Sequence, residues 1–228
     1  MIQLTIDGTP VTTTTPDMTI LAAARQAGID IPTLCHHDNI EPPISCFICV
    51  VKIEGQENFV PSCATKAQNG MIVDTCSELV RNCRKQALEL MFSEHVGAIK
   101  KVDIDDTQAY RLQCGCVKKD TCRLKIYAEE YAIDLTRYAA NRRPSTTHPR
   151  KKYDSGLIHE PGKCIVCGKC VNITKARNIN PGLAFHGRGS NVYISAPYGT
   201  AFDEAMGAAI SECVEACPTG ALWMLEKY

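Results

Sequence analysis

Apolar and polar residues at the start of the chain follow the pattern of a small β-sheet. Apolar residues alternate with polar ones over residues 2–6, which is the period of a half-buried strand, and Asp7-Gly8 is a turn signal. The alanine-rich stretch at residues 19–27 is followed by Gly28, as at the end of a short helix. Further strands are expected at residues 11–15, 50–53 and 71–73. Residues 1–76 therefore form the first predicted domain, a sheet crossed by one helix.

A second domain, residues 77–141, is expected to be helical. Thr75 and Glu78 form a capping box at the start of a helix. This helix should end near His95, and its predicted apolar face is made of Val80, Ala87, Leu90 and Met91. A polar, acidic stretch follows at residues 100–106, and a second helix is predicted at residues 123–134.

Residues 142–152 separate this domain from the last one. The stretch holds five basic residues, two prolines and no acidic residue. It is either a solvated connector or an electrostatic docking strip for a partner subunit. The third predicted domain, residues 153–228, carries one further helix between Phe202 and Glu215.

The composition excludes several classes of protein. Lys and Arg together number 25, as do Asp and Glu, so the net charge is zero and no overall basic field would attract nucleic acid. No apolar run approaches the ~18 residues of a membrane-spanning helix, and the first residues show no export signal. We expect a cytoplasmic protein that neither binds nucleic acid nor inserts directly into a membrane.

The 14 cysteines dominate the chemistry of the chain. Disulfides are disfavoured in a reducing compartment, so this cysteine content favours metal binding. Iron–sulfur clusters take soft thiolate ligands in tetrahedral geometry, and each cluster needs about four ligands that converge on one point. Most of the cysteines fall into three groups, one in each predicted domain.

The first group consists of Cys35, Cys46, Cys49 and Cys63, with the spacing C-x10-C-x2-C-x13-C. A gap of ten residues inside a ligand set suits a zinc finger poorly. The phrase IPTLCHH around Cys35 resembles the ferredoxin-like domain that opens the large iron–sulfur subunit of respiratory complex I and of related hydrogenases. The resemblance implies a 2Fe–2S cluster on the four cysteines. His36 and His37 could suggest Rieske-type ligation, but four cysteines are available, so we assign the histidines structural or hydrogen-bonding roles.

The third group consists of Cys164, Cys167 and Cys170, with the spacing C-x2-C-x2-C. Thr174 stands where a bacterial ferredoxin would place its fourth cysteine, so the fourth ligand must come from elsewhere. Cys217, in the phrase CPTGAL, is the candidate. Relatives of complex I share this arrangement, including a GRG stretch at residues 187–189, which implies a 4Fe–4S cluster. Cys213 is expected to be a small buried apolar residue instead.

The middle group departs most from the family pattern, which is H-x3-C-x2-C-x5-C with the histidine at a helix end. Here His95 ends the phrase LELMFSEH but lies 19 residues before Cys114, and the cysteines read C-x-C-x5-C. The gap looks like an insertion between the helix and the cysteine loop. A long loop can still bring His95 and the cysteines together, because loop-closure entropy grows slowly with length. The resemblance implies a 4Fe–4S cluster on His95, Cys114, Cys116 and Cys122. Two alternatives stay open: Cys76 or Cys83 replaces His95, or this group holds no cluster.

No catalytic motif accompanies the cysteines. Gly187-Arg188-Gly189 lacks the third glycine and the following helix of a dinucleotide site, and the chain has no P-loop, HExxH or GxSxG motif. We therefore expect a protein without a catalytic site of its own.

The whole chain resembles the N-terminal iron–sulfur region of the complex I 75-kDa subunit family, and in length it resembles the small diaphorase subunit of NAD-reducing hydrogenases. The resemblance implies an α+β protein with a β-grasp 2Fe–2S ferredoxin domain, a small helical His/Cys cluster domain and a ferredoxin-like 4Fe–4S domain. It implies one 2Fe–2S cluster and one or two 4Fe–4S clusters, two if the altered middle motif still holds iron.

The function that this resemblance implies is electron transfer. The chain would relay single electrons between a flavoprotein of the NADH-dehydrogenase type and a catalytic subunit, such as a hydrogenase, a formate dehydrogenase or another reductase. A free soluble multicluster ferredoxin is the alternative, although such a carrier should be strongly acidic and this chain has no net charge. A thiol- or zinc-based structural protein is the third possibility.

Overall fold

The computed structural model describes residues 1–38, 40–95, 99–104, 107–112, 117–118, 120–135, 137–138 and 149–225. Its α+β content agrees with the predicted fold class. The N-terminal sheet has five strands in the order β2-β1-β5-β3-β4, in which β1 pairs antiparallel with β2 and parallel with β5. These strands are β1 (Ile2–Ile6), β2 (Thr9–Thr13), β3 (Val50–Ile53), β4 (Phe59–Pro61) and β5 (Ile72–Asp74).

Helix α1 (Ile20–Gln26) packs against this sheet, as the sequence predicts. Thr19 caps its first turn by accepting a hydrogen bond from the backbone N–H of Ala22 at 3.2 Å. Gly28 follows the helix with φ +75°, a conformation that glycine adopts at little cost. The return strand lies two residues earlier than predicted, and β4 is an additional strand that the pattern did not indicate.

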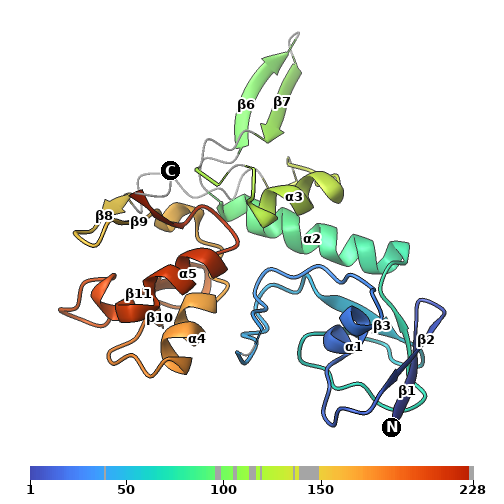
Figure 1. The fold of residues 1–228 in the computed structure, drawn as a ribbon. Helices are drawn as coiled ribbons and strands as arrows, with labels where there is room; N and C mark the ends of the chain where they lie inside the picture. Colours follow the sequence, from blue (N-terminus) through green and yellow to red (C-terminus); the bar gives the residue numbers. More distant parts are fainter. Residues whose placement is uncertain are drawn as a thin grey trace.

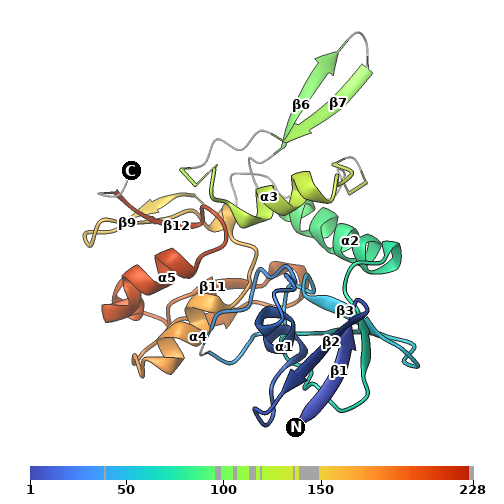
Figure 2. The same ribbon diagram turned by 45° about the vertical axis from the view of Figure 1, so that its right-hand side comes forward.

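Helix α2 (Glu78–Glu94) runs above the N-terminal sheet and links it to the rest of the molecule (Figures 1 and 2). The predicted capping box is wrong: Ser77 caps the helix, while the side chain of Thr75 donates its hydrogen bond to Asp7. The predicted apolar face is also partly wrong, because Leu90 is 52% exposed.

The buried face of α2 is instead made of Val80, Arg84, Leu88 and Phe92, at a spacing of four residues. This buried face is hard to recognise in the sequence, because the charged residue Arg84 interrupts its apolar pattern. The guanidinium of Arg84 donates to the carbonyl of Val50 at 2.8 Å and to the hydroxyl of Tyr131 at 3.1 Å, so two of its three nitrogens are hydrogen-bonded inside the core. Among the described residues, its buried Nε has no hydrogen-bond partner.

Helix α3 (Arg123–Glu130) packs along α2 and is shorter than predicted. The contacts of Arg84 with Tyr131 and of Arg81 with Glu130 place the end of α3 against the first half of α2, so the two helices are antiparallel. Strands β6 (Ile99–Ile104) and β7 (Thr107–Leu112) form an antiparallel hairpin that stands away from the other elements in both views (Figures 1 and 2). This hairpin accounts for most of the extra residues between His95 and Cys114.

The C-terminal region combines two small sheets with two helices. Its strands are β8 (Lys151–Lys152), β9 (Leu157–His159) and β12 (Leu222–Met224) in one sheet, and β10 (Ala184–His186) and β11 (Tyr193–Ser195) in the other. The helices are α4 (Lys169–Ala176) and α5 (Ile210–Ala216), with short 3-10 segments η3 (Pro161–Lys163), η4 (Gly189–Asn191) and η5 (Glu204–Ala209).

Two predictions for this region need correction. The single helix expected between Phe202 and Glu215 is divided into η5 and α5, because Gly207 adopts a non-helical conformation with φ +50°. Strand β8 belongs to the C-terminal sheet, although its two residues were predicted to end the linker; residues 142–148 of that linker lie outside the described residues. Among the described helices, none is long and apolar enough to cross a membrane.

Candidate metal centres

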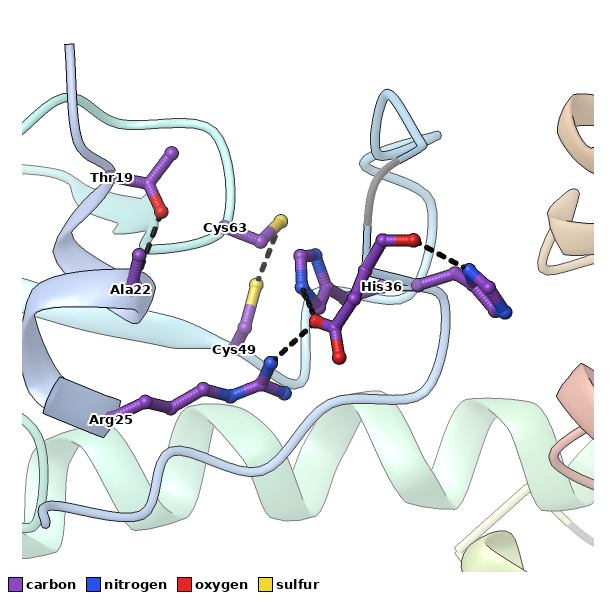
Figure 3. Close-up of polar contacts among 8 residues, drawn as sticks. Thr19, Ala22, Arg25, His36, Cys49 and Cys63 are labelled. Carbon is purple, nitrogen blue, oxygen red and sulfur yellow. Dashed lines mark hydrogen bonds and ion pairs between the residues drawn. The ribbon is translucent and has the colours of Figure 1, made fainter. Parts of the chain in front are cut away.

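The first cysteine group lies between the N-terminal sheet and α2, with its members arranged as two thiol pairs. The sulfur atoms of Cys49 and Cys63 are 3.3 Å apart, and their side chains point toward each other in Figure 3. Cys35 and Cys46 form the second pair, which a thiol–thiol hydrogen bond joins. Two pairs fit a 2Fe–2S cluster, because each tetrahedral iron that is bridged by two sulfides needs two further ligands.

Each pair contains one thiol that ionises readily. The hydrogen bond from Cys46 lowers the pKa of Cys35 to about 5 even though burial opposes this shift. In the same way, the hydrogen bond from Cys63 lowers the pKa of Cys49 to about 7. The same hydrogen bonds raise the pKa of the partner thiols Cys46 and Cys63. Thiolates are the form of cysteine that binds iron, so one thiol of each pair is suited to bind a metal first.

The two histidines that follow Cys35 are held by Asp38. Nε2 of His36 lies 3.1 Å from a carboxylate oxygen of Asp38, which also accepts a hydrogen bond from Arg25 at 2.8 Å (Figure 3). Nδ1 of His37 lies 2.9 Å from the backbone carbonyl of Asp38. These contacts support the hydrogen-bonding role that the sequence analysis assigned to both residues.

Left-handed backbone conformations occur inside the cysteine loops. Phe47, between Cys46 and Cys49, has φ +56°, and Val166, between Cys164 and Cys167, has φ +53°. A β-branched residue such as valine rarely takes this conformation, and such strain concentrates at functional sites. In the loop between Cys164 and Cys167, the N–H of Val166 also donates a hydrogen bond to the sulfur of Cys164 at 3.3 Å. A backbone that donates to sulfur is suited to a thiolate-bound cluster.

The third cysteine group surrounds an apolar cavity in the C-terminal region. Its walls include His159, Ile194, Phe202 and Leu222 together with five cysteines: Cys164, Cys167, Cys170, Cys213 and Cys217. Burial raises the pKa of Cys164 to about 12 and also raises the pKa of Cys167 and Cys170. Thiolates are costly in such a place unless positive charge lies beside them, and Lys169, which also lines the cavity, supplies only one cation for several thiolates. Bound iron would supply that positive charge, so the cavity fits a cluster.

Cys217 is better placed than Cys213 to be the fourth ligand. Its charge raises the pKa of Cys164, Cys167 and Cys170, so it lies near all three, and it lines the same cavity. Cys213 affects only Cys170 among them, and its sulfur lies 3.9 Å from the backbone carbonyl of that residue. Cys213 is fully buried, as expected for a packing residue.

The middle group is described only in part, because Cys114 and Cys116 lie outside the described residues. His95 caps the C-terminal end of α2 and is 7% exposed. Its Nδ1 atom is buried and has no hydrogen-bond partner among the residues that the structure describes. Burial, with a smaller effect of Lys163, lowers the pKa of His95 to about 4, so the imidazole is neutral and can donate a lone pair. A buried polar atom in this state fits a metal ligand.

The position of Cys122 favours His95 over Cys76 and Cys83. Cys122 begins α3, and because α3 is antiparallel to α2 it lies at the end of α2 that carries His95. Cys76 precedes the other end of this 17-residue helix, about 25 Å away at 1.5 Å per residue. Cys83 is three turns from His95.

All three groups meet at one hydrophobic core. Cys35 and Cys46 of the first group, Cys122 of the middle group and Cys167 of the third belong to one buried cluster with Leu34, Ile48, Leu88, Phe92 and Leu124. A hydrogen bond from Ser45 to the carbonyl of Cys167, at 3.0 Å, joins the first and third loops directly. No sequence motif marks Ser45 or Lys118, because their partners lie more than ninety positions away.

Residues 1–78 match the family of 2Fe-2S iron-sulfur cluster binding domains. With the paired cysteines and the mixed sheet, this match identifies the N-terminal region as a 2Fe–2S ferredoxin-type domain, and the chain as an iron–sulfur protein.

Similarity to known proteins extends over almost the whole chain. The chain is 33% identical over 230 residues to the NADP-reducing hydrogenase subunit HndD of Solidesulfovibrio fructosivorans, covering 97% of this chain and 36% of that protein. It is 27% identical to the mitochondrial NADH-ubiquinone oxidoreductase 78 kDa subunit of Candida albicans, covering 97% of this chain and 28% of that protein. The chain therefore spans well under half the length of these curated relatives.

A solved structure of a NAD+-reducing NiFe-hydrogenase in the H2-reduced state contains a similar chain. The TM-score is 0.77 at 28% identity, and the similarity covers 98% of this chain and 87% of that one. The resemblance drawn from the cysteine motifs is thus confirmed: this chain is a homologue of iron–sulfur subunits of complex I and of NAD(P)-linked hydrogenases.

Proposed function

We propose that this protein is the iron–sulfur electron-transfer subunit of a multisubunit oxidoreductase, which passes single electrons between a flavoprotein of the NADH-dehydrogenase type and a catalytic subunit. Iron–sulfur clusters, when bound, supply the one-electron carriers. The proposed domains are residues 1–76, 77–141 and 153–228, joined by residues 142–152, of which Lys151 and Lys152 pair with the C-terminal sheet as β8.

The proposed ligands follow the three cysteine groups. Cys35, Cys46, Cys49 and Cys63 would hold a 2Fe–2S cluster. One 4Fe–4S cluster would be held by His95, Cys114, Cys116 and Cys122, and a second, in a ferredoxin-like domain, by Cys164, Cys167, Cys170 and Cys217.

The observation that carries the proposal is the shared core beneath the three groups. Cysteines of all three lie in one hydrophobic cluster, and the hydrogen bond between Ser45 and Cys167 holds two of the loops together. A protein that stored iron or used zinc for stability would not need its sites side by side. A relay does, because electrons pass between carriers only over short distances.

The chain's own residues keep these sites dry and fixed. Leu34, Leu88 and Leu124 are fully buried beside the cysteines and exclude water. Thr219, two residues after Cys217, donates a hydrogen bond to the carbonyl of Lys163, at 2.8 Å, which joins the two ends of the third ligand set. Ligands that do not move on reduction keep the cost of structural rearrangement small.

The relatives support the choice of partners. One is named as a subunit of an NADP-reducing hydrogenase and another as a subunit of an NADH-quinone oxidoreductase. Both names describe an assembly in which a nicotinamide reaction is linked to a second reaction. A carrier between two such reactions is the role that this chain, with cysteine sites along its length, is best suited to fill.

Electron paramagnetic resonance tests the proposal on anaerobically purified protein reduced in steps with dithionite. We expect a slowly relaxing 2Fe–2S signal and fast-relaxing 4Fe–4S signals that are visible only at low temperature. Gel filtration of the native protein should show it in a larger complex, whereas a free ferredoxin would elute alone. If the protein reduced with dithionite shows no iron–sulfur signal, the proposal is wrong.

A further inference from the structure

Lys118 is a buried lysine beside the third cysteine group. It is 8% exposed, and it lies in the chain between Cys116 and Cys122 of the middle group. Its ammonium donates to the backbone carbonyl of Val214 at 2.6 Å and to that of Cys217 at 3.4 Å. A side chain of the middle region therefore reaches into the C-terminal region, at the residue proposed as the fourth ligand.

Buried lysines are rare unless a negative charge accompanies them. Within the part of the chain that the structure describes, no ion pair joins Lys118 to a carboxylate, and its acceptors are neutral carbonyl groups. These carbonyls belong to the end of α5, whose helix dipole offers only a partial negative charge. The dipole alone compensates a full buried charge poorly.

Other cations gather at the same place. Arg123 and Lys169 line a surface cleft together with Lys118, Cys217 and one acidic residue, Glu215. Lys169 also lines the cavity of the third cysteine group. Lys169 is close enough to Cys167, Cys217 and Cys35 to respond to their charge. The positive side chains thus lie where the first and third cysteine groups approach each other.

We propose that Lys118 is a buried counter-charge of the third cluster site, in addition to Lys169, and raises the reduction potential of that site. This inference rests on the proposed 4Fe–4S cluster at Cys164, Cys167, Cys170 and Cys217. Four thiolates make such a site anionic, and one-electron reduction adds a further negative charge. A fixed cation nearby stabilises the reduced state more than the oxidised state, so it raises the potential.

The test is a redox titration of the third site, followed by electron paramagnetic resonance on the full chain. The signal of this site is identified as the one that disappears in Cys217→Ser. Lys118→Met and Lys118→Gln remove the charge, and the second keeps a hydrogen-bond donor for the carbonyls. Both should shift the midpoint potential of this signal to lower values, whereas Lys118→Arg should stay near the wild type.

Lys175→Met is the matched control. Lys175 also lies in the last turn of a helix, α4, but it is exposed, so its removal should leave the potential unchanged. Loss of the third-site iron in both neutral variants, with retention in Lys118→Arg, would also support a counter-charge. An unchanged potential with iron intact, or iron loss in Lys118→Arg as well, would overturn it. A wild-type protein without the third signal would instead refute the proposed cluster.

Discussion

Cys213 and Cys217 lie four residues apart and line the same cavity, so only their surroundings separate a ligand from a packing residue. Cys217 lies near enough to the three cysteines of the C-x2-C-x2-C loop to raise the pKa of each, whereas the sulfur of Cys213 lies 3.9 Å from the backbone carbonyl of Cys170. The same substitution at the two positions therefore distinguishes their roles.

Replacement of Cys217 with Ser should remove one 4Fe–4S signal and about four iron atoms per chain, because a hydroxyl is a poor substitute for a thiolate. The 2Fe–2S signal should remain. Electron paramagnetic resonance and iron analysis measure both effects. Cys213→Ser is the control and should keep every signal; if it loses one, the assignment of the fourth ligand is wrong.

His95 gives a second test at the residue scale. Its buried Nδ1 atom has no hydrogen-bond partner among the described residues and lies at the end of α2 that is close to Cys122. His95→Ala should abolish one fast-relaxing signal, while Cys76→Ser and Cys83→Ser should leave all signals in place. Retention of both 4Fe–4S signals in His95→Ala would show that the imidazole is not a ligand.

Among the elements, α2 has the widest influence because its buried face supports the shared core. Leu88 is fully buried against Cys35, Cys46 and Cys122, whereas Leu90, two positions later, is 52% exposed. Leu88→Ala should lower the free energy of unfolding by about 2–5 kcal/mol, through lost contacts and the cavity left behind.

Leu90→Ala in the same helix should change the free energy of unfolding by less than about 0.5 kcal/mol. Circular dichroism under anaerobic conditions would record the two thermal midpoints. Equal midpoints for the two variants would mean that the core beneath the cysteine groups does not depend on α2.

The elements also show what the sequence could predict. Alternation over β1 and the alanine-rich stretch of α1 place both elements within a residue of their observed bounds, because local periodicity alone decides them. The buried face of α2 escaped prediction because Arg84 stands in its middle, and its partners Val50 and Tyr131 are distant in sequence. Helix α4 escaped because its first turn is part of a cysteine loop.

The candidate site also combines features that the sequence predicts with features that only the folded structure shows. Cysteine spacing was enough to propose the ligand sets, since a cluster needs particular side chains in numbers that spacing reveals. Spacing could not reveal that the three sets share one core, or that Ser45 and Lys118 join them, because these contacts arise only when the chain folds. The hairpin β6–β7 likewise could not be predicted, because its sequence shows only a polar, acidic stretch and its two strands are defined by their pairing with each other.

At the scale of the whole molecule, iron should stabilise the C-terminal region more than the N-terminal hairpin. Five cysteines line the cavity beside α4 and α5, so bound iron would tie these helices and the loops around them together. Strands β1 and β2 pack through Leu4, Ile6 and Val11 into the core of the N-terminal sheet, which includes Cys49 and Cys63 but is made mostly of aliphatic side chains that pack without iron.

Removal of iron with a chelator should therefore increase amide hydrogen exchange in α4 and α5 much more than in β1 and β2. Mass spectrometry of the two forms measures the difference peptide by peptide. A uniform increase along the chain would indicate that the apoprotein unfolds as one unit.

The central claim is that the three cysteine groups hold iron–sulfur clusters, and the most direct measurement is iron and acid-labile sulfide per chain in anaerobically purified protein. About ten iron atoms and a similar number of sulfides are expected for one 2Fe–2S and two 4Fe–4S clusters. About six iron atoms would remove the middle site from the account. Zinc in place of iron would contradict it.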